Sequence, residues 1–217
     1  MKKLLFLTTA AVCLYGAVAQ NPPKLNGEVY NPDGIELIYV EGSDSIKGFF
    51  IGRYEVTQAQ WQSIMGSNPS YFKGDSLPVE MVSWNDVQEF LEKLNEKTGR
   101  SYRLPTEIEW RYAAKGGTNN DTCEYAGSNN VEEVAWYWEN SDKRTHTVGI
   151  KKPNSLGIYD MSGNVWEWCQ DLWESPYHVY RGGSWGDKAL HCRVAFGSTV
   201  TLDSHYLTYV GFRVVLP

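Results

Sequence analysis

The sequence predicts a single α+β domain that is compact and rich in loops. Three helix-start signals lie before residue 117, and the hydrophobic spacing typical of helices disappears after it. The second half consists instead of Gly, Asn, Asp and aromatic residues around short strand-like runs. Nine Trp, fourteen Tyr and twenty Gly indicate a turn-rich fold in which large rings, rather than long regular elements, make the core.

Residues 1–19 are expected to be a secretory signal peptide. Lys2 and Lys3 give a positive start, residues 4–14 are apolar, and Ala17-Val18-Ala19 is typical of a cleavage site. The apolar stretch is shorter than the roughly 20 residues that span a bilayer. We therefore expect an exported protein, periplasmic or extracellular, without a transmembrane segment.

The remaining chain is divided by composition at residue 34. Residues 20–34 contain three prolines with several Asn and Gly, which predicts a leader, and residues 35–217 are expected to form the domain. The formal charge of the whole chain is −6, and loss of Lys2 and Lys3 would make it more negative by two. Because an acidic surface repels phosphate backbones, nucleic acid is not expected as a partner.

The first half is expected to hold two strands followed by three helices. Residues 35–40 and 48–56 have strand composition. A hydroxyl residue followed three positions later by an acid or amide is a capping box, which predicts helix starts at Thr57, Ser83 and Thr106. Glycine at residues 66, 99 and 116–117 is expected to end these helices.

The second half is expected to contain short strands at residues 179–181, 193–195 and 211–215. A loop-rich region of this size needs buried rings, a metal ion or a disulfide to hold it. Signal cleavage would leave an odd number of cysteines, so at most one internal disulfide can form among Cys123, Cys169 and Cys192. Zinc is not expected, because the chain has no C-x-x-C pair and its histidines are scattered.

Six short strings occur in order along residues 35–216. They are GRYEVT at 52–57, PVEMVSW at 78–84, YRLPTEIEW at 102–110, GIYDMSGNVWEW at 157–168, RGGSW at 181–185 and GFR at 211–213. Together they resemble the formylglycine-generating enzyme (sulfatase-modifying factor) family. The resemblance implies a compact C-type lectin-like fold with little regular secondary structure, in agreement with the pattern above.

The string at 157–168 carries the residues best suited to a metal ion. Carboxylates, backbone carbonyls and water are the ligands that calcium prefers. In the resembled family this stretch holds a structural calcium ion, and the match implies the side chains of Asp160 and Glu167 with the carbonyls of Gly163 and Val165. The alternative is a metal-free turn before a strand.

The resemblance also implies a substrate groove near Trp166, Ser184 and Trp185. The oxidase members convert a substrate cysteine to formylglycine with two copper-binding cysteines that follow the RGGS-aromatic string. Here the segment 186–193, GDKALHCR, holds one cysteine, Cys192. Because copper(I) prefers soft thiolates, one thiol is not expected to hold it, and oxidase activity is not expected. Ser184, His191 and Asp187 could form a Ser–His–Asp arrangement, but no signal marks the serine as a nucleophile.

Two further expectations come from the resemblance. A disulfide between Cys169 and Cys192 is possible, because the segment after Cys192 packs near Cys169 in the family. The alternative is that both are small core residues with free thiols. No catalytic residues are predicted.

The leading hypothesis is an exported ligand- or protein-binding module stabilised by calcium. Its partner would be an extracytoplasmic protein or glycan, contacted through the surface loops at residues 173–179 and 199–209. One alternative is a sulfatase-modifying enzyme or another activity in the groove. The other alternative is an accessory subunit of a surface or secretion assembly.

Overall fold

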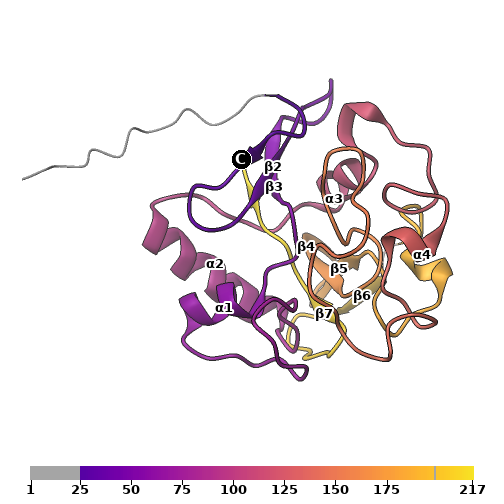
Figure 1. Ribbon diagram of the computed structural model, residues 1–217. Helices are drawn as coiled ribbons and strands as arrows, with labels where there is room; N and C mark the ends of the chain where they lie inside the picture. Colours follow the sequence, from indigo (N-terminus) through magenta and orange to yellow (C-terminus); the bar gives the residue numbers. More distant parts are fainter. Residues whose placement is uncertain (1–24, 198) are drawn as a thin grey trace, which may run out of the picture.

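The computed structural model describes residues 25–197 and 199–217 (Figure 1). The signal peptide expected at residues 1–19 lies outside the described residues. The strands form two four-stranded sheets, and the three longest helices follow the first three strands in the sequence. In the part of the chain that the structure describes, no helix is both long and apolar enough to cross a membrane.

The first sheet joins the beginning of the domain to its end. Its strands are β1 (Val29–Tyr30), β2 (Leu37–Val40), β3 (Phe49–Gly52) and β8 (Val215–Leu216), in that order and antiparallel throughout. β1 lies in the stretch expected to be a leader. Asp33 in the same stretch forms an ion pair with Arg100 at 2.7 Å and accepts a hydrogen bond from the Tyr102 hydroxyl at 2.7 Å. Residues 25–34, which we expected to be a leader, therefore include a strand of the first sheet and contact the domain through Asp33.

The second sheet carries the candidate site. Its order is β6 (Thr199–Leu202), β5 (Tyr177–Arg181), β4 (Trp166–Glu174) and β7 (Val210–Gly211). β4 pairs with β5 antiparallel and with β7 parallel, so it lies in the middle of the sheet. The strand expected at residues 193–195 is absent. The chain turns there after the short helix η2 (Ala189–Cys192), because the Phe196 amide donates back to the Arg193 carbonyl at 3.0 Å.

The three expected helices are confirmed, with the expected starts. They are α1 (Gln58–Met65), α2 (Trp84–Thr98) and α3 (Glu107–Ala114), and each begins with a complete capping box at Thr57, Ser83 or Thr106. Gly66 and Gly99 end the first two in the left-handed conformation, with φ of 79° and 68°. Beyond them the described helical segments are short: η1 (Gly117–Asn119), α4 (Val131–Val134) and η2.

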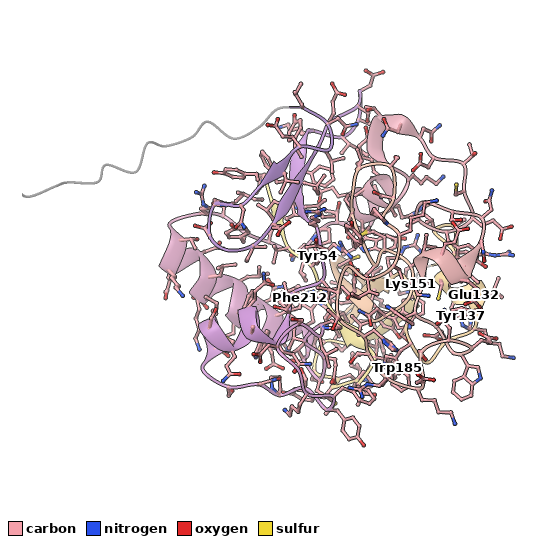
Figure 2. All side chains as sticks on the ribbon, viewed as in Figure 1. Tyr54, Glu132, Tyr137, Lys151, Trp185 and Phe212 are labelled. Atoms are coloured by element: carbon pink, nitrogen blue, oxygen red, sulfur yellow. The ribbon has the colours of Figure 1, made fainter. Side chains whose placement is uncertain are left out.

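Aromatic packing fixes the helices against the second sheet. The rings of Trp61 on α1 and Phe90 on α2 are stacked at 5.2 Å. Phe212, in the segment between β7 and β8, meets both rings edge-on at 6.0 and 5.3 Å and is fully buried. Figure 2 shows Phe212 in the interior beside α1 and α2. This contact positions the C-terminal segment, and through β7 it positions β4.

Candidate functional site

Two neighbouring residues of β4 lead to two different sites. Successive side chains of a strand point to opposite faces of the sheet. Trp166 extends to a pocket at the surface, while Glu167 enters a centre that is sealed from solvent. Each site contains a carboxylate, and the surroundings of that carboxylate decide what each site can do.

The pocket has a volume of about 270 Å³ and largely aromatic walls. The lining residues are Trp166, Tyr180, Ser184, Gly186, Asp187, His191, Phe196 and Tyr209. The Trp166 ring meets Tyr180 edge-on at 5.1 Å and lies 6.4 Å from the ring of Phe196. Because Trp166 and Tyr180 are buried while Phe196 and Tyr209 are partly exposed, the rings extend from the core to the rim.

Asp187 is held in this pocket by neutral donors. Its Oδ2 accepts hydrogen bonds from Trp166 Nε1 at 2.7 Å and from the Ser184 hydroxyl. The amide of Asp187 donates to the Ser184 carbonyl at 3.1 Å, which closes the turn that brings the two residues together. The Asp187 side chain is 25% exposed. Among the described residues, no cation is hydrogen-bonded to this carboxylate at the pocket wall.

Ser184, Asp187 and His191 gather here, but not as a catalytic triad. In a triad the histidine lies between the serine and the carboxylate. Here the Ser184 hydroxyl donates directly to Asp187, and His191 Nδ1 lies 3.3 Å from the other carboxylate oxygen without forming a hydrogen bond. The histidine therefore has no position from which to deprotonate the serine, and the arrangement is suited to binding.

Trp185, expected in the groove, does not line the pocket. Its indole Nε1 donates to the Thr208 carbonyl at 3.0 Å, and its ring meets Phe72 edge-on at 5.5 Å. Ser141 donates its hydroxyl to the Trp185 carbonyl at 2.7 Å. Figure 2 shows this residue on the lower side of the molecule. Trp185 therefore braces the loop that carries Ser184, whereas Trp166 and Ser184 line the pocket.

The expected surface loops are partly strands. Residues 173–179 include the end of β4 and the start of β5, where Trp173 and Tyr177 are 68% and 41% exposed. Residues 199–209 include β6, and Tyr206 in the following loop is 56% exposed. Exposed rings are therefore present in both segments, and those of the first lie on a β-hairpin.

Cys192 is buried beneath the pocket and does not line it. A Cβ atom added to Gly183, which has a φ of 79°, would lie 2.8 Å from Cys192 Sγ, so the thiol fills the space under this turn. Burial raises the pKa of the Cys192 thiol far above its usual range, and the negative charge of Asp187 adds to the effect. The thiol therefore stays protonated, which is the unreactive form.

The possible Cys169–Cys192 disulfide is not formed in the structure. Cys123, Cys169 and Cys192 are all free. Cys169 packs with Trp110 in one apolar cluster, while Cys192 packs with Tyr125 in another. The two thiols are enclosed by different parts of the core, which matches the alternative of two small core residues.

The sealed centre is an arginine–carboxylate pair. Arg213 donates from Nε to Glu167 Oε2 and from Nη2 to Oε1, both at 2.6 Å, and Trp110 Nε1 donates to Oε2 at 2.6 Å. Both charged side chains are 0% exposed. Arg213 also donates to the carbonyls of Gly52 and Tyr159, each at 2.9 Å. The pair thus joins β3, β4 and the segment before β8.

Two further carboxyl groups lie close to this pair. Glu55 accepts from Asn164 Nδ2 at 2.6 Å and from the Val165 amide at 3.1 Å. Asp160, with a φ of 56°, accepts from the Gly149 amide at 2.7 Å, while its Oδ1 is buried without a partner. Burial raises the pKa of Glu55 well above its usual range and that of Asp160 to about 6. Three carboxyl groups therefore share one guanidinium.

The expected calcium ligands fit an ion only in part. Asp160 fits, because its Oδ1 lacks a partner in the protein. Glu167 does not, because both of its oxygens accept from Arg213. Gly163 lies where a Cβ atom would be 2.4 Å from the Trp136 carbonyl oxygen, and Val165 follows on the same turn. Within residues 25–197 and 199–217, no group of three His, Cys, Asp or Glu side chains is placed to hold a metal ion.

The fold and the site together define a C-type lectin-like domain of the formylglycine-generating enzyme type. Residues 34–217 match the sulfatase-modifying factor enzyme 1-like domain, and the chain belongs to this family. The match covers all six strings, the pocket and the sealed centre.

Three similar proteins differ in what their names state. The chain is 34% identical to the chaperone protein LppX of Paenibacillus barcinonensis, covering 85% of this chain and 88% of that protein. It is 33% identical to the formylglycine-generating enzyme of Thermomonospora curvata, covering 73% of this chain but 61% of the enzyme's length. Among solved structures, Treponema denticola variable protein 1 has a TM-score of 0.75 at 27% identity, with 87% and 98% of the two chains covered.

Proposed function

We propose that the protein is an exported binding module that has the family's pocket without the family's oxidase chemistry. The observation that carries the proposal is the position of Cys192. It is the one cysteine after the RGGSW string, and it is buried beneath Gly183 while the pocket beside it is open. Copper(I) chemistry needs accessible thiolates, and none faces the pocket among the described residues.

A protein is the partner class that we propose. A relative that matches most of this chain is named a chaperone, which acts on other proteins. The exposed rings of Trp173, Tyr177 and Tyr206 supply contact area suited to a protein surface. Export is supported by the pattern of residues 1–19 and places the partner outside the cytoplasm.

The oxidase part is tested with a cysteine-containing sulfatase peptide, copper and oxygen. We expect no aldehyde on the peptide with this protein, while the Thermomonospora curvata enzyme in the same assay produces it. Aldehyde that disappears in a Cys192→Ser variant would overturn the proposal and favour the alternative of a sulfatase-modifying enzyme.

The binding part is tested by crosslinking in the exported fraction of the native host. The wild type and a Trp138→Ala control, altered at a ring 49% exposed and outside the pocket lining, are expected to capture the same protein. A Phe196→Ala variant, altered in the pocket, is expected to capture less of it. Equal capture by all three would place the interaction elsewhere, and recovery of a glycan instead of a protein would change the partner class.

We also propose that calcium stabilises the domain at Asp160. Support comes from the excess of buried carboxyl groups around Arg213 and from the unpartnered Asp160 Oδ1. A divalent cation would reduce the repulsion among these groups. Calcium in this role has no part in chemistry at the pocket, and thermal unfolding with calcium and with chelator tests it.

A further inference from the structure

We propose that the pocket binds an organic ammonium group. The inference rests on the proposed binding function of this pocket and names the chemistry that the pocket selects. It stands on four aromatic side chains, a carboxylate with neutral partners, and the small volume of the pocket.

The walls are the first reason. Trp166, Tyr180, Phe196 and Tyr209 line the pocket. The face of an aromatic ring attracts a cation that comes within about 6 Å of its centre, and indole does so most strongly. The Trp166 ring is fixed by its hydrogen bond to Asp187 and by the contact with Tyr180. The ring that attracts a cation best is thus held next to the carboxylate.

The charge is the second reason. Asp187 receives hydrogen bonds from an indole and a hydroxyl, and neither neutralises it. The described lining includes no Lys or Arg, and its other titratable residues are His191, Tyr180 and Tyr209. Burial raises the pKa of Tyr180 to about 12, with smaller contributions from Tyr209 and Asp187, so this ring stays neutral in the pocket. An anion would be repelled here, and a cation would meet a carboxylate whose hydrogen-bond donors are neutral.

The volume is the third reason. Pockets for drug-sized ligands measure about 300–1,000 Å³, and this one measures about 270 Å³. It therefore suits the head of a long side chain or a small amine better than a sugar chain. An alkylated ammonium also has apolar methyl or methylene groups to pack against the rings. The same chemistry is offered by a lysine side chain of a protein partner and by a free amine.

The test compares charged and neutral probes of one shape. Binding of choline and of its neutral carbon isostere 3,3-dimethylbutan-1-ol is measured by NMR titration or calorimetry at pH 8, where an ordinary histidine is uncharged. We expect choline to bind the wild type at least tenfold more tightly than the isostere. Equal affinities, or no saturable binding of any ammonium probe to the folded protein, would overturn the inference.

Substitutions in and outside the pocket test whether choline binds there. Asp187→Asn keeps an oxygen that accepts from Trp166 and Ser184, and we expect it to weaken choline at least tenfold. Phe196→Leu keeps an apolar wall without a ring, and we expect a loss of about threefold or more. Glu139→Gln removes an exposed carboxylate that does not line the pocket and should leave binding unchanged. Unchanged binding by Asp187→Asn would contradict the inference; if that variant does not fold, the choline and isostere comparison on the wild type decides.

Two further probes identify the source of the ammonium group. Blocked lysine binding more tightly than choline supports a side chain of a protein partner, and the reverse order supports a free amine. This inference and the proposed function can fail separately. If crosslinking captures a partner that Phe196→Ala loses while no ammonium probe binds, the binding module stands and the ammonium inference falls.

Discussion

Glu167 and Asp187 are two carboxylates at the same strand: Glu167 lies on β4, and Asp187 is hydrogen-bonded to Trp166 of β4. They differ in burial and in the charge of their hydrogen-bond partners. Glu167 is fully buried, and both of its oxygens accept from Arg213. Asp187 is 25% exposed and is held by Trp166 and Ser184. In the sealed site the ion pair with Arg213 occupies both oxygens of the carboxylate, so neither is free to bind a ligand. Neutral partners at the surface fix the position of Asp187 and leave its charge for a ligand.

The largest expected effect comes from breaking the sealed pair. Arg213→Met would leave Glu167 buried without its cation, and we expect it to lower the free energy of unfolding by about 3–5 kcal/mol. The double variant Arg213→Met, Glu167→Gln removes both charges and should recover part of this loss. Urea unfolding measures both. Arg193→Met, at an exposed ion pair with Glu124, is the control and should change little. A loss as small as that of the control would mean that the pair does not hold the domain together.

The next effect concerns the other carboxyl groups near Arg213. If calcium binds at Asp160, chelation should lower the midpoint of thermal unfolding of the wild type by several degrees, because an ion that binds the folded state alone stabilises it. The Asp160→Asn variant, lacking the ligand charge, should have nearly the same midpoint with calcium and with chelator. Equal midpoints of the wild type in the two conditions would show that calcium does not stabilise the folded state.

Glu80 is a carboxyl group whose burial raises its pKa, although the charge of Lys73 opposes the shift. It is 0% exposed and accepts from the Phe72 amide at 2.8 Å, and burial raises its pKa to about 7. The folded state therefore holds the proton between the ordinary pKa near 4.5 and about 7, and stability falls as the pH rises through this window. We expect a loss of up to roughly 3 kcal/mol between pH 4.5 and pH 8.

The matched variant for Glu80 is Glu80→Gln, which keeps an oxygen for the Phe72 amide. Its unfolding free energy should lack this pH-dependent component, so the difference from the wild type isolates the group. Glu89→Gln, on the exposed side of α2, should follow the wild type. A wild type and a Glu80→Gln variant with parallel pH profiles would show that Glu80 titrates normally.

The smallest effect on stability is expected at Asp187. Asp187→Asn retains an acceptor for Trp166 and Ser184, so we expect the free energy of unfolding to change by less than about 1 kcal/mol. Urea unfolding of this variant beside Arg213→Met compares the two carboxylate sites directly. A loss as large as that of Arg213→Met would mean that Asp187 is a structural residue like Glu167.

The helices and the fold class could be predicted from the sequence because their signals are local. A capping box at Thr57, Ser83 or Thr106 needs four consecutive residues, and the structure forms all three. The strands of the second half were harder, because their pairing depends on distant segments. The strand expected at residues 193–195 is a turn because Val194 donates to the carbonyl of Glu124 and not to a strand of a sheet.

The candidate site was predictable only in part for the same reason. Trp166 and Ser184 were identified from strings of the family, and both line the pocket. The role of Glu167 was missed because its partner Arg213 is 46 residues away, although both lie in recognised strings. Tyr180, Phe196 and Tyr209 carry no local signal for a pocket, since aromatic residues in strands and loops are also typical of a core.

The position of residues 210–216 sets the order in which the protein can fold. β3 finds a ladder partner in β8, the Val56 amide donates to the Phe212 carbonyl, and Arg103 bridges to Val215. β3, Val56 and Arg103 therefore lack these partners until a segment more than a hundred residues further along the chain has been synthesised. These contacts form only once residues 210–216 have been synthesised. For a chain that we propose to be exported, the first half therefore lacks these contacts while the residues in between are being synthesised.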